Sequence, residues 1–148
     1  MRTITLVALL TLLPALGHAQ DKQVINNPGT ALGLPLSSVV RVGNLLFLSG
    51  QIGTKPGTRE PVAGGTEAEV RQALENIKST LENAGSSMDR VAKCTVFLAD
   101  MADFAAMNQV YVTFFSKDPP ARSTVAVKGL ALGAHVEIEC IAVAGPAK

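Results

Sequence analysis

The sequence predicts an α+β fold, a mixed sheet of strands with two helices packed on one of its faces. Strand-like apolar runs alternate with two segments of helical periodicity, in the order strand, strand, helix, strand, helix, strand, strand. The chain has 148 residues, 47% of them hydrophobic, a length that suits one compact domain rather than two. These observations favour a single two-layer domain.

The first two strands form a predicted hairpin. Val39–Val42 and Leu45–Leu48 flank Gly43-Asn44, and a Gly-Asn pair between two β-rich runs is typical of a tight turn. The preceding segment, residues 20–35, is polar and interrupted by Gly and Pro. We expect it to lack regular structure.

The helix predicted over residues 66–84 has the clearest signal. Thr66 and Glu69 fit a capping box, in which each side chain bonds a free amide at the helix start, and Gly85 is a C-terminal stop. The apolar residues recur every three or four positions and form one stripe: Val70, Ala73, Leu74, Ile77, Leu81 and Ala84.

The rest of the chain predicts a second helix and three more strands. Residues 91–99 are a mostly apolar strand, and Asp100 is the expected cap of a helix that ends before Pro119. Residues 121–127 and 135–143 complete the sheet. The second helix carries an apolar stripe that suits the core better than a cofactor site: Phe104, Met107, Val110, Tyr111 and Phe114.

Residues 1–19 have the pattern of a secretory signal peptide. Arg2 precedes an apolar run over residues 4–16, and Gly17 and Ala19 place small residues where signal peptidase reads. The run is shorter than the roughly 20 apolar residues that span a bilayer, and a retained membrane anchor is the alternative. We expect cleavage to leave one domain, residues 20–148, periplasmic or secreted and free of the membrane.

Charge and cysteine content bear on the class of function. The chain has 13 basic and 12 acidic residues, so no basic excess favours nucleic acid as a partner. Cys94 and Cys140 permit one disulfide in an exported protein, but both lie in apolar runs, and we expect them to be unpaired and buried. Because His135 is the single histidine after residue 19, the sequence predicts no metal site.

The last predicted strand carries the first candidate for chemistry. Alternation gives it one apolar face and a second face with His135, Glu137 and Glu139. Two interpretations stay open from the residues alone. This is either a solvent-exposed face of the sheet or the wall of a cleft, where a carboxylate transfers protons or positions water.

Arg122 is the second candidate, at the point where the chain enters the preceding strand. Its guanidinium can bind a substrate carboxylate bidentately, or it can be a surface residue with a transient ion pair. Thr124 lies on the same side of that strand. Ser49-Gly50 and Asn108 can supply neutral polar contacts, although a turn and a solvent-facing helix position would equally explain them.

Taken together, these segments resemble the RidA (YjgF) family of reactive-intermediate imine deaminases. The resemblance runs from about Val24 to Val143. It rests on GNLLFLSGQI at 43–52, QALENIKSTLENAG at 72–85, TVFL at 95–98, DFAAMNQVYVTFF at 103–115, PARSTV at 120–125 and VEIECIAV at 136–143. The PARS segment followed by an EIE strand is the most specific signature.

The resemblance implies a chorismate-mutase-like fold and a homotrimer with pockets between adjacent subunits. It implies that Arg122 binds the substrate carboxylate and that Glu137 positions or activates the hydrolytic water. No metal or organic cofactor is implied. The other substrate-binding positions that it implies are Ser49, Gly50, Asn108 and Thr124.

Two positions depart from the family pattern. Leu36 stands where members often have Tyr after a proline, and Thr124 stands where many have Cys. Loss of the Tyr hydroxyl removes a hydrogen-bonding group from the pocket and bears on substrate preference. The missing Cys matters less, because imine hydrolysis requires no thiol nucleophile.

We expect a deaminase that converts 2-imino acids and enamines, such as 2-aminoacrylate, to 2-oxo acids and ammonia. The alternative is a non-catalytic trimer that binds a small carboxylate or a protein partner, favoured by Leu36 and by export. A nucleic-acid or translation-related activity, attributed to some relatives, is disfavoured by the near-neutral charge and by export.

Overall fold

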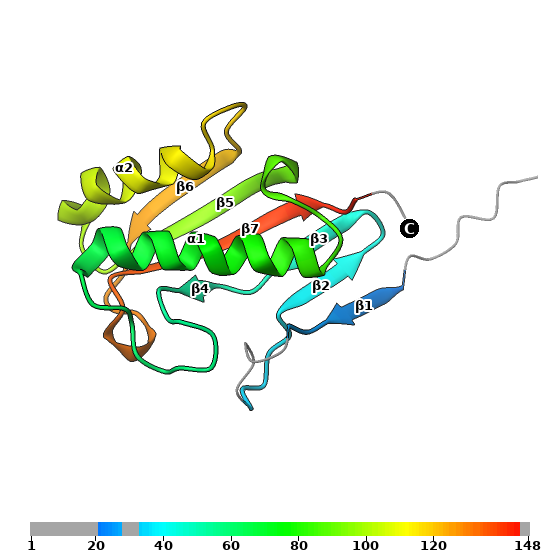
Figure 1. The fold of residues 1–148 in the computed structure, drawn as a ribbon, viewed down its shortest axis with the longest axis horizontal. Helices are drawn as coiled ribbons and strands as arrows, with labels where there is room; N and C mark the ends of the chain where they lie inside the picture. The colour runs from blue at the N-terminus through cyan, green and yellow to red at the C-terminus, as the bar shows by residue number, and fades with distance from the viewer. Residues whose placement is uncertain (1–20, 28–32, 146–148) are drawn as a thin grey trace, which may run out of the picture.

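One mixed sheet organises the protein, and both helices cover the same face of it (Figure 1). The computed structural model describes residues 21–27 and 33–145, and the predicted signal peptide, residues 1–19, lies outside them. The helices in this part of the chain are α1 (Gly65–Asn83) and α2 (Phe104–Phe114). The strands are β1 (Lys22–Ile25), β2 (Val39–Val42), β3 (Leu45–Leu48), β4 (Gln51–Ile52), β5 (Val91–Leu98), β6 (Ala121–Ala126) and β7 (Val136–Val143).

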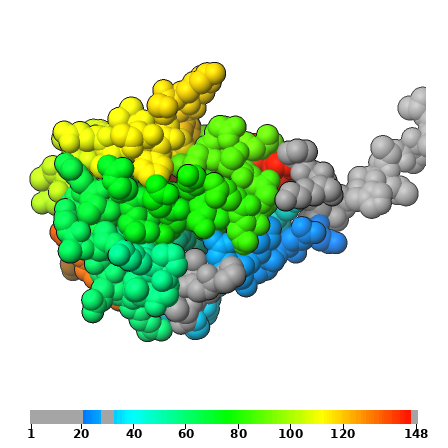
Figure 2. Space-filling view, viewed as in Figure 1, coloured from blue at the N-terminus to red at the C-terminus, as the bar shows by residue number. Residues whose placement is uncertain are grey.

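The strand order is β1-β2-β3-β7-β5-β6, with β4 paired to β7. β5 and β6 are parallel, because α2 connects them across the sheet, and the other pairs are antiparallel. Figure 2 shows the side chains of α1 and α2 covering this side of the molecule. The predicted α+β class, a mixed sheet with two helices on one face, is confirmed.

The expectation that residues 20–35 lack regular structure is wrong for the beginning of this segment. Lys22–Ile25 forms β1 and pairs antiparallel with β2, with Val24 opposite Val40. Four residues are too few to show the alternation that predicts a strand. β1 forms because its backbone pairs with the otherwise unpaired edge of β2. Residues 28–32 of the same segment lie outside the described residues. The hairpin itself is confirmed, with Gly43 at a φ of 58° in the turn.

α1 buries the predicted stripe, but the capping box is wrong. The helix begins at Gly65, after Gly64, and no side chain caps it. The Glu69 carboxylate instead accepts the backbone N–H of His135 at 2.8 Å and contacts its ring Nδ1 at 2.6 Å. This contact raises the pKa of His135. It also turns His135 toward α1, away from the face that Glu137 and Glu139 share.

Asp100 caps a different element from the one expected. Its carboxylate accepts the N–H of Ala102 at 2.9 Å and caps a short 3₁₀ turn, Met101–Asp103, which leads into α2. α2 then buries Met107, Val110 and Tyr111 against the sheet, so its apolar stripe is part of the core as expected.

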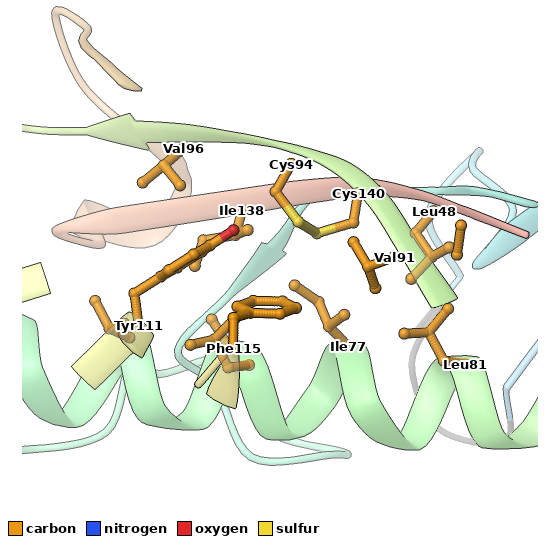
Figure 3. Close-up of a cluster of buried hydrophobic side chains, with 14 of the residues drawn as sticks. Leu48, Ile77, Leu81, Val91, Cys94, Val96, Tyr111, Phe115, Ile138 and Cys140 are labelled. Atoms are coloured by element: carbon orange, nitrogen blue, oxygen red, sulfur yellow. A yellow bond between two sulfur atoms is a disulfide. The ribbon is translucent and has the colours of Figure 1, made fainter. Parts of the chain in front are cut away.

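Cys94 and Cys140 are buried as expected, but they form a disulfide, so the expectation that they are unpaired is wrong. Figure 3 shows the bond between β5 and β7, inside the cluster that includes Ile77 and Phe115. The two cysteines are direct partners in the antiparallel register, with Cα atoms 4.1 Å apart. Residues so placed project side by side from the same face of the sheet, which is why the sulfurs meet.

The sheet face turned away from the helices is partly apolar. Leu45, Phe47 and Val125 project from it and remain exposed. None of the helices within 21–27 and 33–145 has the length and apolar character of a membrane span.

Candidate active site

Glu137 lies on the sheet face opposite the helices, directly beside Gly50. β4 pairs with β7 so that Ile52 is opposite Glu137. Gly50, which directly precedes β4, therefore lies close to the carboxylate of Glu137. A Cβ atom on Gly50 would lie 1.9 Å from Glu137 Oε1. Only glycine therefore leaves room for the carboxylate in this position.

The environment of Glu137 favours its protonated form. Burial, and secondly the negative charge of Glu139, raise the pKa of the Glu137 carboxyl group above its usual value. A carboxyl group with a raised pKa can both accept and return a proton nearer to neutral pH. This is the protonation behaviour that a general acid–base catalyst requires.

A cavity of about 320 Å³ opens beside Glu137. Its wall is formed by the segment before β2, by β4 and the loop after it, and by the 3₁₀ turn Ala131–Gly133. Gly50 and Glu137 line it together, as do Leu34, Leu36, Ser38, Gln51, Arg59 and Leu132. The site is thus a largely apolar recess with one carboxylate, that of Glu137, and one guanidinium, that of Arg59.

Ser49 does not line the cavity but bonds to the segment that forms its wall. Its hydroxyl donates to the Ser37 carbonyl at 2.6 Å, and its backbone N–H donates to the Ser38 carbonyl at 3.1 Å. These bonds tie the segment before β2 to the end of β3. In one chain Ser49 therefore helps to fix the wall of the cavity, and its hydroxyl oxygen can still accept a hydrogen bond from a ligand.

Arg122 lies on the other face of the sheet, against α2. Its Cζ is 4.6 Å from the ring centroid of Tyr111 and 5.8 Å from that of Phe104. Its Nη1 is 3.8 Å from Met107 Sδ. Contact with two aromatic faces stabilises a guanidinium and limits its orientations, so α2 holds Arg122 in place.

Thr124 and Asn108 lie near Arg122. Thr124 faces the helices because it is the register partner of the buried Val96, and Asn108 is half-buried on α2, three residues before Tyr111. The hydroxyls of Thr124 and Tyr111 are buried and lack a hydrogen-bond partner within the described part of the chain. Burial raises the pKa of Tyr111 to about 12, against a smaller opposing effect of Arg122.

The candidate residues therefore form two groups that one chain does not bring together. The glutamate half-site consists of Gly50, Glu137 and the cavity. The arginine half-site consists of Asn108, Arg122 and Thr124. β5 separates β6 from β7, and the two half-sites face opposite sides of the sheet. Because β6 is an edge strand, the arginine half-site lies at a free edge of the sheet.

Some lining residues carried no signal in the sequence. Ser38, Arg59 and Leu132 come from three separate connecting segments and Gln51 comes from β4, so their meeting depends on how these segments fold over β7. The sequence contains one local indication at Leu132, because the glycine that follows it, Gly133, predicts a turn. Within the described ranges, no three His, Cys, Asp or Glu side chains are grouped closely enough to hold a metal ion.

Comparison with known proteins identifies the family. Residues 26–144 match the family described as Endoribonuclease L-PSP. The chain belongs to this family, the RidA/YjgF family. The resemblance inferred from the PARS and EIE segments is thereby confirmed at the level of the family.

Individual RidA/YjgF proteins match most of the chain. A RutC family protein of Pyrococcus horikoshii is 48% identical over 108 residues, which are 73% of this chain and 86% of that protein. The 2-iminobutanoate/2-iminopropanoate deaminase of Mus musculus is 44% identical over 112 residues, 76% of this chain and 83% of the mouse protein. The crystal structure of the YjgF gene product from E. coli matches with a TM-score of 0.76 at 38% identity, covering 82% of this chain and 98% of that one.

Proposed function

We propose that this RidA/YjgF protein is a hydrolytic deaminase that converts 2-imino acids, and the enamines in equilibrium with them, to 2-oxo acids and ammonia. The observation that carries the proposal is the Glu137 carboxyl group, held against Gly50 at the cavity with a raised pKa. Relatives that are 41–45% identical and are named 2-iminobutanoate/2-iminopropanoate deaminase support the same reaction.

The complete site is proposed to form between subunits of a homotrimer. Within one chain Arg122 and Glu137 face opposite sides of the sheet, so a single subunit cannot hold one substrate with both. The apolar open face, with Leu45, Phe47 and Val125, favours burial against another copy. A closed ring of head-to-tail contacts would place the arginine half-site of each subunit on the glutamate half-site of the next.

In this mechanism Arg122 of one subunit binds the carboxylate of the imino acid and orients C2 toward Glu137 of its neighbour. Glu137 accepts a proton from a water molecule as the water oxygen bonds to C2, and the C=N double bond becomes a single bond. Glu137 passes this proton to the nitrogen, the hydroxyl group now on C2 gives up its own proton to the nitrogen by way of Glu137, and the C–N bond breaks. Ammonia leaves, and the new C2–O bond becomes the carbonyl of the 2-oxo acid.

The test is to generate 2-imino acids with an amino-acid oxidase and to follow their decay. The wild-type protein should accelerate hydrolysis, and Arg122→Ala and Glu137→Gln should each return it close to the uncatalysed rate. Arg71→Ala and Glu75→Gln, which change exposed residues of α1, are the matched controls and should keep wild-type activity. Decay at the uncatalysed rate with the wild-type protein would contradict the proposal.

Leu36 favours the second candidate, a non-catalytic trimer that binds small carboxylates, because the family's tyrosine hydroxyl is missing there. Calorimetry with 2-oxo acids separates the two: tight binding without turnover supports the binding protein. The family description also names an endoribonuclease. The net charge of +1 argues against binding to a polyanionic backbone.

We further propose that the protein is exported to an oxidising compartment. The sequence of residues 1–19 has the pattern of a signal peptide, and the Cys94–Cys140 disulfide is a bond that persists mainly outside the cytosol. Mass spectrometry of the protein from its host should find a chain that begins at Gln20. A cytosolic protein that retains Met1 would contradict export.

A further inference from the structure

Three leucines form an apolar wall in the cavity of the glutamate half-site. Leu34, Leu36 and Leu132 all line it, and their exposed fractions are 54%, 47% and 56%. They come from two segments distant in sequence, which lie below α1 in Figure 1. Large apolar side chains that remain exposed around one recess, beside the charged groups of Glu137 and Arg59, are typical of a site that binds an apolar group together with a polar one.

The backbone of Leu132 strengthens this interpretation. Its φ of 58° and ψ of 19° lie in the left-handed region, which glycine adopts easily and bulky residues rarely adopt. Residues in such conformations destabilise the fold and cluster at active sites and ligand-binding sites. Leu132 thus combines an unfavourable backbone conformation with an exposed apolar side chain, and both are explained if the side chain contacts a ligand.

We propose that the leucine wall selects 2-imino acids with aliphatic side chains of about four carbons, such as the imine derived from leucine, over the imine derived from alanine. This inference rests on the proposed function, since it names the substrate class of the same site. The cavity of about 320 Å³ can take such a side chain while Glu137 remains at the reacting carbon. The polar head of the substrate then faces Glu137, and its tail faces Leu36 and Leu132.

The expected preference follows from the hydrophobic effect. Each methylene group removed from water favours binding by about fourfold. The leucine-derived imine has three more carbons than the alanine-derived imine, which gives a limit of roughly 60-fold if all are buried. Because the wall is half-exposed, we expect a preference of about tenfold or more in kcat/KM.

The experiment compares kcat/KM for the two imino acids, each made by an amino-acid oxidase, with wild-type protein and with variants of the wall. Leu132→Asn is the sharpest variant, because asparagine tolerates the left-handed backbone and replaces only the apolar surface. Leu36→Ser is the second variant, should Leu132→Asn fail to fold. Each should lower the preference for the leucine-derived imine several-fold. Val112→Ser, which changes an exposed residue of α2 outside the cavity, should leave the preference unchanged.

The outcomes separate this inference from the proposed function. Equal turnover of both imino acids by the wild-type protein, or an unchanged preference in both wall variants, overturns the inference and leaves the deaminase standing. If neither imino acid is turned over, the proposed function fails. Calorimetry then decides the inference, since 4-methyl-2-oxopentanoate should bind about tenfold more tightly than pyruvate, and equal affinities would overturn it.

Discussion

Gly50 determines where the Glu137 carboxylate lies, and the substitution Gly50→Ala tests this. The new Cβ would meet Glu137 Oε1, the end of a flexible side chain, so the carboxylate should move and the fold should survive. We expect the deaminase rate to fall by about 10- to 100-fold, because a displacement of about 1 Å has effects of this size on catalysis. Imine decay and thermal denaturation measure the two effects separately.

Gly53→Ala is the control for that experiment. Its Cβ would lie 2.5 Å from the Cα of Glu69, so the backbone of α1 must shift. We expect a loss of about 1–3 kcal/mol in the free energy of unfolding. The role given to Gly50 is contradicted if Gly50→Ala keeps full activity, or if it destabilises the fold as much as Gly53→Ala does.

Glu139 contributes to the pH dependence that we predict for the proposed reaction, because its charge is the second cause of the raised pKa of Glu137. The Glu137 carboxylate must be deprotonated to accept a proton from water, so activity should fall as the pH drops through its raised pKa. Glu139→Gln removes the second cause of that rise and lowers the pKa of Glu137. The acid limb of the kcat/KM profile should therefore move to lower pH, while burial keeps it above the position of an ordinary glutamate.

The pH profile of Glu75→Gln provides the comparison, since this variant removes one negative charge from the exposed side of α1. Its acid limb should coincide with that of the wild-type protein. An acid limb that stays in place in Glu139→Gln would show that Glu137 does not carry the proton.

Individual side chains differed in how far the sequence could place them. Alternation along β6 correctly assigned Arg122 and Thr124 to one face, because a local rule sets the direction of strand side chains. It could not show that Tyr111 and Phe104 hold the guanidinium, since α2 reaches β6 only through the tertiary fold. The position of Leu132 in the cavity depends in the same way on contacts between loops.

At the scale of elements, the Cys94–Cys140 disulfide joins β5 to β7 in the middle of the sheet. It closes a loop with a sequence separation of 46 residues, and removing it should cost about 2–4 kcal/mol of unfolding free energy. The double variant Cys94→Ala, Cys140→Ala should therefore denature at a lower temperature than the oxidised protein. Denaturation curves with and without a reductant measure this difference.

The reductant also supplies the internal comparison. It should lower the stability of the wild-type protein toward that of the double variant and leave the double variant unchanged. Two titratable thiols in the unreduced, unfolded wild-type protein would contradict the disulfide.

Elements with a local signal were predictable, and elements that depend on distant partners were not. The hairpin at Gly43 and the apolar stripe of α1 follow from turn chemistry and periodicity. The capping box failed because Glu69 bonds His135, 66 residues away in sequence. The disulfide was missed because the register of β5 on β7 aligns the two cysteines, and no local pattern encodes a register.

At the scale of the whole molecule, one chain carries the two proposed half-sites on opposite faces of its sheet. The arginine half-site lies at the free edge formed by β6, and the glutamate half-site lies beside the apolar open face. Family membership fixes the fold and supports the chemistry, whereas assembly decides whether the two halves meet. A single sequence encodes this separation only through strand order, which periodicity does not reveal.

Subunit complementation tests the shared site most directly. Arg122→Ala and Glu137→Gln subunits, each inactive alone, are unfolded together and reassembled at equal concentration. In a cyclic trimer every mixed assembly contains one intact site, so random assembly should restore about one quarter of the wild-type deaminase rate. A mixture that forms trimers but stays as inactive as its components would contradict a site built from Arg122 of one subunit and Glu137 of the next.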